Sequence, residues 1–374
     1  MIGSSLLNPL LSIFAKDLGA TGVQIGLVVS GYWIARVLME IPAGFLSSKF
    51  GYYRLLVMGL SLSAAGSFLC SFAAEPYVLT LARAVTGFGA PLYFGVAMTL
   101  VINLFDDRRR GSAMGIFQGL EFIGSFIGAT FSGYIVTMLK FRMSFVLSGI
   151  ISTIAVALIV LPKNVRKMET KKGDPASPAF KLSTIRNVLR SRNLLIASSA
   201  IFAEFIMGTG VLFTIFPIYA KEQLRISIEE IGLLMGARSA GYSLAMLSMG
   251  YVSDRLGRRP VLLFGLALTG ILAILLSMTN AALLLAAVIF FVGVSTGAIW
   301  IVCPVLAAEG VSPSERGPAI GTYRTFLDLG SVFGPIIMTA AQVGFGFDAC
   351  FYLSALILFI NLVPALGVRE IIRR

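Results

Sequence analysis

The chain has 374 residues, of which 57% are hydrophobic and only 13% charged, and its mean hydropathy is +0.89. Soluble domains carry about 25% charged residues, so this composition excludes an ordinary soluble protein. The formal net charge is +12. On a soluble surface such a charge would indicate nucleic acid, but in a membrane protein it sets orientation, and we expect no nucleic-acid partner.

The residue inventory also limits the chemistry. The chain has no histidine and three cysteines, Cys70, Cys303 and Cys350, each alone in an apolar run and none in a CxxC pair. These features argue against a metal site or a disulfide framework, and we predict neither a metal nor a cofactor. No nucleophile or base constellation indicates an enzyme. The first residues lack a basic region and an A-x-A-like site, so no cleavable signal peptide is predicted.

Long apolar runs without alternation predict membrane-spanning helices. Lipid offers the backbone no hydrogen-bond partners, so only helices or closed barrels span it, and a barrel needs alternation. We predict an all-α integral membrane protein with twelve transmembrane helices. Their expected positions are residues 2–15, 23–47, 53–73, 77–104, 112–138, 143–162, 194–219, 230–252, 260–279, 281–305, 317–341 and 349–368.

Orientation follows from the lysines and arginines. Of the 30 in the chain, 21 fall in the terminal segments and loops of one side, five in the loops of the other side, and four inside predicted spans. The first side is therefore predicted to be cytosolic, with both termini there. We expect a multi-pass protein of the cytoplasmic cell membrane.

The two halves repeat at a fixed offset of 206 residues. Residues 25–27, Ile-Gly-Leu, recur at 231–233. Five glycines, at positions 44, 51, 115, 124 and 128, recur at 250, 257, 321, 330 and 334. We predict two parallel-repeat six-helix bundles with a substrate site between them, an arrangement typical of transporters.

The repeat predicts a short first helix. Residues 13–16 recur at 218–221, so the counterpart of Leu194, where helix 7 begins, would lie about eleven residues before Met1. Helix 1 then has roughly 15 residues, about 22 Å at 1.5 Å per residue, against about 30 Å of hydrocarbon. Either the first helix is truly short or the native chain starts upstream. We hypothesise the upstream start, which the intact mass of the native protein would test.

In the first half, four ionisable residues lie inside spans, where such groups are functional candidates. Helix 2 carries Arg36 and Glu40, four residues apart, which can neutralise each other on one helix face. Helix 4 carries Arg83, and helix 5 carries Glu121 deep in its span. Tyr32, Trp33 and Tyr93 are candidate cavity-lining aromatics, although aromatics on apolar helices are more often packing residues.

The segment 163–193 is the one long polar stretch, and it divides the chain into predicted domains 1–162 and 194–374. Lys171–Pro175 has the composition of a linker. The following residues, 180–192, interleave apolar and basic side chains. They predict either a basic amphipathic helix on anionic lipid or a solvated cytosolic linker.

In the second half, Glu204 lies about ten residues into helix 7, near the midplane, and Arg238 lies at similar depth on helix 8. Low dielectric disfavours the charged form of a carboxyl group, so Glu204 and Glu121 are candidates for carrying a proton. Arg238 is placed to pair with either of them. Trp300 is a further candidate for the cavity wall.

The loop between helices 8 and 9 contains the sharpest motif, Gly250-Tyr-Val-Ser-Asp254-Arg255-Leu-Gly257-Arg258-Arg259. It resembles the G-x-x-x-D-R-x-G-R-R signature of the major facilitator superfamily. In physical terms it is a tight cytosolic turn in which glycines allow close packing. The resemblance covers nearly the whole chain and is greatest to the drug- and sugar-efflux branch. It implies alternating-access transport of a small molecule, with protons as the coupling ion.

The matching loop of the first half keeps Gly44 and Gly51 but departs from the pattern elsewhere. Ser48 stands in place of the aspartate, and Tyr52 and Tyr53 stand in place of the basic pair. In the superfamily that aspartate helps to close the cytosolic gate, so this role is not predicted for the first half.

Two further patterns resemble superfamily motifs. Arg83-Ala-Val-Thr-Gly87-Phe-Gly89 resembles a helix 4 motif of proton-coupled members, whose arginine tunes the protonation of a nearby carboxyl group. The glycines spaced along helices 5 and 11 resemble the antiporter motif, but its proline is found on helix 11, as Pro335, while helix 5 has Ala129. The main role expected of these spaced glycines is helix packing, because small residues let helix backbones approach closely.

Helix 11 carries Arg324 and Asp328, again four residues apart. In the superfamily helices 2 and 11 are neighbours across the two halves. The depths predict that Arg36 faces Asp328 and Glu40 faces Arg324, as a lock between the halves. The other possibility is that each pair closes on its own helix.

The sequence therefore predicts a monomeric secondary transporter for a small, drug- or sugar-like substrate, exporting it in exchange for protons across the lipid bilayer. An uptake symporter or a facilitator of the same fold is the alternative. A non-transporting membrane sensor is a remote one, because no soluble output domain is present.

Overall fold

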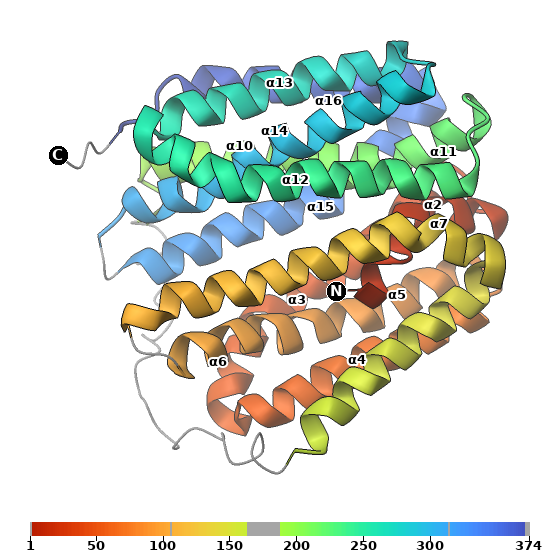
Figure 1. Ribbon diagram of the computed structural model, residues 1–374, viewed down its shortest axis with the longest axis horizontal. Helices are drawn as coiled ribbons and strands as arrows, with labels where there is room; N and C mark the ends of the chain where they lie inside the picture. The colour runs from red at the N-terminus through yellow and green to blue at the C-terminus, as the bar shows by residue number, and fades with distance from the viewer. Residues whose placement is uncertain (1, 105–106, 163–187, 313–314, 371–374) are drawn as a thin grey trace. The chain divides into compact units, whose positions relative to one another are not determined.

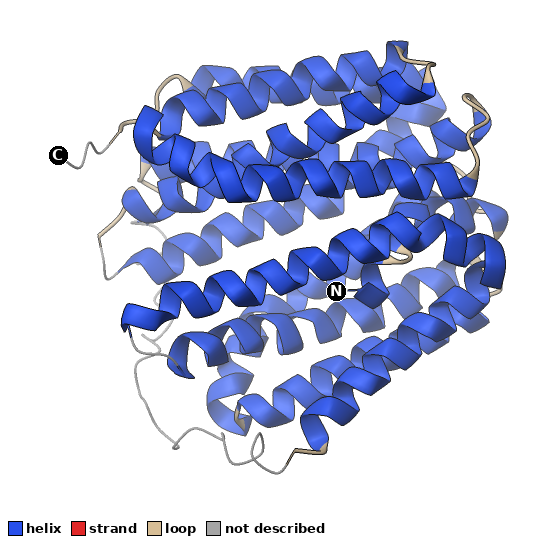
Figure 2. Ribbon diagram, viewed as in Figure 1, coloured by secondary structure: helices blue, strands red, loops and turns tan. Residues whose placement is uncertain are grey.

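The computed structural model describes residues 2–104, 107–162, 188–312 and 315–370. These residues form helices joined by short loops, and no strand occurs among them (Figure 2). The chain divides into two units, Met1–Ser177 and Pro178–Arg374. Most of the predicted linker, residues 163–187, lies outside the described residues.

In the N-terminal unit, predicted helix 1 is broken into short pieces, in keeping with Pro9 near its middle. Predicted helix 4 is interrupted by a π-helical segment. Predicted helices 5 and 6 run on as one element, divided where Lys140 adopts φ 64° and ψ 161°. The elements are α1 (Ile2–Ser5), η1 (Asn8–Leu10), α2 (Leu11–Asp17), α3 (Val23–Phe50), α4 (Tyr52–Phe72), α5 (Pro76–Ala90), η2 (Pro91–Gly95), α6 (Val96–Leu104) and α7 (Asp107–Val160).

In the C-terminal unit, only predicted helix 7 is interrupted, by the π-helical segment η3. Helix 8 begins with a capping box, in which Ser227 and Glu230 satisfy each other's backbone N–H groups. The elements are α10 (Arg192–Phe205), η3 (Ile206–Ile215), α11 (Phe216–Glu222), α12 (Ile228–Leu256), α13 (Arg258–Met278), α14 (Ala282–Glu309), α15 (Arg316–Phe345) and α16 (Phe347–Ala365).

Among the described residues, eight helical stretches are long and apolar enough to cross a membrane. One of them, Ile116–Val160, contains both predicted helices 5 and 6. Helix 1 is too short to be included, helix 4 is interrupted, and the middle of helix 8 is less apolar because it contains Arg238 with several glycines and serines. With these three added, the described helices account for the twelve predicted spans.

Corresponding helices pack in the same way in the two units. In the N-terminal unit, α3 and α4 both contact α5, and α7 contacts α4 and α1. In the C-terminal unit, α12 and α13 both contact α14, α13 contacts α16, and α15 contacts α10. Figure 1 shows each unit as a bundle of this kind. The helices of the two units thus make the same contacts in the same chain order, as the predicted repeat requires.

Glycines fix the closest helix contacts at repeat positions. A Cβ atom at Gly87 on α5 would collide with the carbonyl oxygen of Tyr32 on α3. A Cβ atom at Gly293 on α14 would collide with the carbonyl oxygen of Arg238 on α12. The two contacts are repeat-equivalent, because Gly293 lies 206 residues after Gly87 and Arg238 lies 206 residues after Tyr32. The absence of a side chain thus allows the backbones to approach closely at the same place in each unit.

The spaced glycines of helices 5 and 11 make equivalent contacts. A Cβ atom at Gly128 would lie 2.7 Å from the carbonyl oxygen of Ile2 on helix 1. At Gly334 it would lie 3.2 Å from the backbone nitrogen of Gly210 on helix 7. These glycines therefore pack helix 5 on helix 1 and helix 11 on helix 7.

Candidate functional site

Glu204 occupies the end of α10, where the regular helix gives way to the π-helical segment η3. Its side chain is only 3% exposed, and its Oε2 atom has no hydrogen-bond partner among the described residues. Interruptions of this type are frequent at functional sites because they re-aim side chains. Glu204 is thus a deeply buried carboxyl group on an irregular part of helix 7.

The charged neighbour of Glu204 is Arg238 on α12, and the two groups interact electrostatically. A Cβ atom at Gly208 would lie 3.6 Å from Oε1 of Glu204 and 4.0 Å from Nη2 of Arg238. Gly208 therefore lies next to both charged tips, at a distance where an added Cβ atom would make ordinary van der Waals contact with them. The guanidinium of Arg238 also lies over the rings of Phe213, at 5.3 Å, and Tyr242, at 6.0 Å.

Aromatic and polar side chains surround this pair. The ring of Trp300 on α14 lies 5.7 Å from Phe205 and 6.4 Å from Tyr242. Tyr323 on α15 and Cys303 on α14 are electrostatic neighbours of Glu204, and the Tyr323 hydroxyl has no hydrogen-bond partner among the described residues. The carboxyl group of Glu204 and the guanidinium of Arg238 thus lie within a largely aromatic wall.

Arg83 is the one charged residue classed as buried among those described in the N-terminal unit, with 7% exposure. Its Nη2 atom donates a hydrogen bond of 3.1 Å to Oδ1 of Asn8, and its guanidinium lies 5.0 Å from the ring of Tyr32. No carboxylate in the described part of this unit forms an ion pair with it. Asn8 was not singled out from the sequence, although an amide within an apolar helix is a signal that could have found it.

Arg36 and Glu40 form an ion pair of 3.8 Å along α3, and the guanidinium of Arg36 lies 5.0 Å from the ring of Trp33. Tyr93, on the π-helical segment η2, is an electrostatic neighbour of Arg36, Arg83 and Glu121. The structure therefore gathers these predicted residues around one tyrosine. Glu121 itself is partly buried on α7.

Helix 11 carries the remaining two predicted charges. Asp328 on α15 is buried, with 1% of its side chain exposed, and Arg324 is partly buried one turn before it. Both residues lie in the C-terminal unit, whereas Arg36 and Glu40 lie in the N-terminal unit. The lock predicted between helices 2 and 11 therefore stays a prediction.

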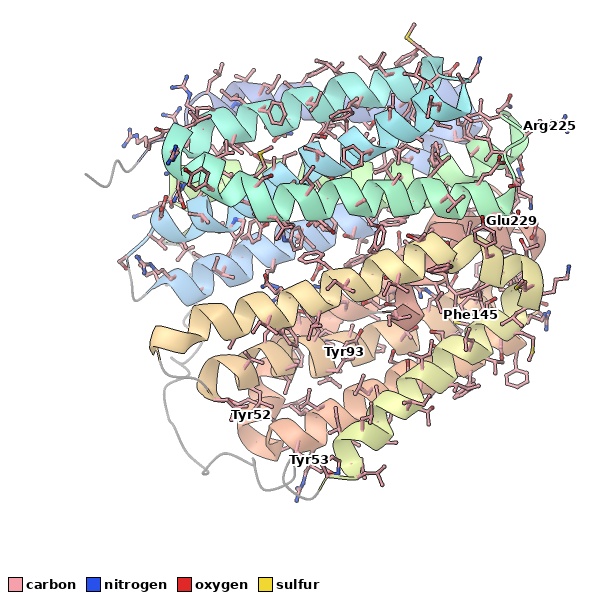
Figure 3. All side chains as sticks on the ribbon, viewed as in Figure 1. Tyr52, Tyr53, Tyr93, Phe145, Arg225 and Glu229 are labelled. Carbon is pink, nitrogen blue, oxygen red and sulfur yellow. The ribbon has the colours of Figure 1, made fainter. Side chains whose placement is uncertain are left out.

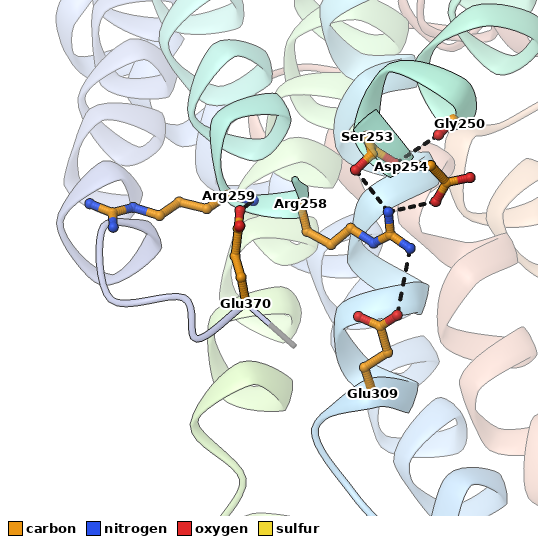
Figure 4. Close-up of polar contacts among 7 residues, drawn as sticks. All are labelled: Gly250, Ser253, Asp254, Arg258, Arg259, Glu309 and Glu370. Carbon is orange, nitrogen blue, oxygen red and sulfur yellow. Dashed lines mark hydrogen bonds and ion pairs between the residues drawn. The ribbon is translucent and has the colours of Figure 1, made fainter. Parts of the chain in front are cut away.

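The loop between α12 and α13 is an ion network (Figure 4). Nη1 of Arg258 lies 2.6 Å from Oδ1 of Asp254 and 2.8 Å from the carbonyl oxygen of Ser253, while its Nη2 lies 3.5 Å from Glu309. The Ser253 hydroxyl donates to the carbonyl of Gly250. Arg258 therefore ties together the ends of α12, α13 and α14. Glu309 was missed in the sequence because it lies far along the chain at the end of another helix.

The rest of this motif is held by neighbouring groups. Gly257 has φ +98°, which an L-residue rarely adopts. Glu370 accepts a hydrogen bond of 3.1 Å from the backbone nitrogen of Arg259 at the start of α13. The guanidinium of Arg255 lies 4.4 Å from the ring of Tyr251. Glu370, like Glu309, is a member of the network that the motif alone did not reveal.

Comparisons with known proteins agree with this architecture. The Major Facilitator Superfamily profile matches residues 1–223 and 200–371. The chain belongs to the Major Facilitator Superfamily. It is a multi-pass membrane transporter for a small molecule, and not an enzyme.

Several relatives cover most of the chain. An uncharacterised MFS-type transporter of Methanocaldococcus jannaschii is 25% identical, covering 93% of this chain and 88% of that protein. The multidrug efflux pump SdrM of Staphylococcus aureus is 24% identical (90% and 85% covered), and the quinolone resistance protein NorA of the same species is 21% identical (91% and 86%).

Solved structures show the same fold at low identity. The nucleoside transporter NupG has a TM-score of 0.78 at 16% identity, with 98% of this chain and 97% of that chain covered. A bacterial homologue of the lysosomal transporter Spinster, inward-facing and occupied, has a TM-score of 0.80 at 15% identity, with 98% and 93% covered.

Of the two repeat-equivalent loops, the one between α3 and α4 departs from the superfamily motif. Gly51 follows α3 with φ +81°, as Gly257 follows α12 with φ +98°. Gly44 lies in the last turns of α3. Ser48 and Tyr52 occupy the positions of Asp254 and Arg258, so the ion pair of the second loop has no counterpart in residue type. The backbone turn is repeated, while the charges are not.

Proposed function

We propose that the chain exports a small, drug- or sugar-like molecule in exchange for protons, by alternating access. The observation that carries this proposal is the buried Glu204 beside Arg238 in the C-terminal unit. Two relatives are named for drug efflux or resistance, which supports export as the direction.

Protonation of Glu204 is the proposed coupling step. A carboxyl group in low dielectric readily takes up a proton, and uptake removes its attraction for Arg238. If the attraction between Glu204 and Arg238 is stronger in one conformation of the transporter than in the other, its loss changes the free-energy difference between the two conformations. Protonation of Glu204 therefore shifts their populations. Glu121, near Tyr93 in the other unit, is the proposed second proton carrier, with Arg83 affecting it through Tyr93.

We also propose the topology that the charge count predicts. Residues 1–162 and 194–374 are then the two bundles, the segment 163–193 is cytosolic, and the protein acts as a monomer in the cytoplasmic membrane. The cytosolic side is the one that holds 21 of the 30 lysines and arginines. A tag after Arg374 should be accessible to protease only in inverted vesicles.

The function is tested with inverted vesicles containing the protein and a fluorescent lipophilic dye. With an acidic interior, wild-type protein should accumulate the dye, and dissipating the pH gradient should release it. Glu204→Gln should lose this accumulation but keep exchange of labelled for unlabelled dye, because exchange needs no net proton movement. Glu230→Gln is the matched control, since it changes an exposed capping residue and should retain accumulation.

Two results would contradict the proposal. Accumulation driven by pH that survives in the double variant Glu204→Gln, Glu121→Gln would exclude these carboxyl groups as carriers. Accumulation only with an alkaline interior would identify an uptake symporter, and dye entry that stops at the outside concentration whatever the gradient would identify a facilitator.

A further inference from the structure

The core of the N-terminal unit contains a small cavity next to Arg83. Its volume is about 20 Å³, measured as room for the centre of a water-sized sphere. About 10–15 Å³ on this measure is enough for one water molecule or an ion of similar size. Helices 1, 2, 3, 4 and 6 supply its walls, which include Tyr93 and Phe145, both labelled in Figure 3.

The cavity is positively charged. Arg83, which is only 7% exposed, lines the cavity. Its buried Nε atom has no hydrogen-bond partner among the described residues. The electrostatic neighbours of Arg83 are Cys70, Tyr32 and Tyr93, which are neutral side chains at pH 7. Glu121 interacts with Tyr93 but is not among these neighbours.

The polar wall offers further donors. Asn8 uses only its amide oxygen toward Arg83. Its amide nitrogen and the hydroxyl of Ser63, which also lines the cavity, form no hydrogen bond within the described residues. Ser67 donates to the carbonyl of Ser63, and its Oγ lies 3.4 Å from that of Ser148. No aspartate or glutamate lines the cavity.

A buried charge without a counter-charge is expensive in a protein interior, and more so in a membrane span. The ring of Tyr32 compensates the guanidinium only in part, since a cation–π contact contributes about 0.5–2 kcal/mol. We propose that the cavity is a binding site for one small monovalent anion of the chloride type. Arg83 supplies the charge, and Asn8 and Ser63 supply neutral donors. This inference is independent of the proposed efflux function.

The test is the melting temperature of the purified, detergent-solubilised chain in sodium chloride and in sodium gluconate at equal ionic strength. Gluconate is too large for the cavity. Chloride should raise the melting temperature by about 3 °C at 300 mM, and bromide should act similarly. Trp33 is in the N-terminal unit and Trp300 in the other, so a Trp300→Phe background reports this unit by tryptophan fluorescence.

Two variants identify the site. Arg83→Gln should abolish the difference between chloride and gluconate. Asn8→Asp keeps the arginine and places a carboxylate at the position of the 3.1 Å hydrogen bond, so the protein neutralises its own charge. It should also lose the chloride effect while remaining folded, which keeps the test decisive if Arg83→Gln does not fold.

Arg36→Gln is the matched control, because Arg36 already has the carboxylate of Glu40 at 3.8 Å, and it should keep the chloride effect. Equal melting temperatures of the wild-type chain in chloride and gluconate would overturn the proposal and leave water as the occupant. An undiminished chloride effect in Asn8→Asp would overturn it as well. In a bromide-soaked crystal, an anomalous peak beside Arg83 would support it, and a peak elsewhere only would contradict it.

Discussion

In the N-terminal unit, the deepest arginine, Arg83, donates to the neutral amide of Asn8, whereas in the C-terminal unit Arg238 lies beside the carboxyl group of Glu204. The helix contacts around the two sites are nevertheless the same, since Gly87 and Gly293 pack against repeat-equivalent backbones. Packing has therefore been retained between the halves while the charges have diverged. A buried carboxyl group beside an arginine is found in one unit, and a buried arginine beside a neutral amide in the other.

The largest expected effect breaks the charge comparison directly. Arg238→Gln should lower the free energy of unfolding by about 3 kcal/mol, because it leaves Glu204 buried without its partner. Arg83→Gln, measured in chloride-free buffer, should cost about 1 kcal/mol or less, since the loss of one hydrogen bond to a neutral group is offset by removal of a buried charge that has no counter-charge. Denaturant unfolding in detergent measures both.

The double variant Glu204→Gln, Arg238→Gln is the control for that prediction. It removes both charges and should recover most of the lost free energy. Equal losses for Arg238→Gln and Arg83→Gln would show that the two arginines do not differ as described.

The packing comparison is sharpened by Gly87→Ala and Gly293→Ala. Each added methyl group meets a backbone carbonyl oxygen that cannot rotate away, so each should cost about 1–3 kcal/mol. The two losses should be similar, because the contacts are repeat-equivalent. Gly95→Ala is the control, since a Cβ atom there meets nothing within 4 Å. A loss confined to one unit would contradict equivalence of packing.

The lock predicted between helices 2 and 11 concerns charges from both units. A double-mutant cycle of Arg36→Gln and Asp328→Asn on the transport rate should show a coupling of about 1 kcal/mol, or roughly fivefold. The corresponding cycle of Arg36 and Glu40 measures the ion pair seen along α3 at 3.8 Å. Coupling in the second cycle alone would show that the pair closes on its own helix and that no lock exists.

The smallest effect is expected in the loop between α12 and α13. Asp254→Asn breaks the 2.6 Å pair with Arg258, yet the Asp254 side chain is 69% exposed, so the loss of unfolding free energy should be about 0.5 kcal/mol. Arg258→Gln should cost more, because it also releases Ser253 and Glu309. Unfolding curves of the two variants compare them. A larger loss for Asp254→Asn would contradict the network as described.

The sequence by itself determined the architecture. Apolar length and the 206-residue offset predicted twelve helices in two parallel repeats, because the bilayer admits so few backbone structures. The motif around Gly257 predicted a tight turn, and the backbone there has φ +98°. Each of these inferences depends on local composition or on spacing along the chain.

Only the tertiary structure decided which polar groups meet. Arg238 was open to pairing with Glu204 or Glu121 and lies beside Glu204. Asn8 reaches Arg83 across 75 residues, and Glu370 reaches Arg259 across 111. The helical period determines which residues, three or four apart, are neighbours on one helix. Contacts between helices depend instead on how each helix is rotated and tilted, which the packing of side chains and glycines determines.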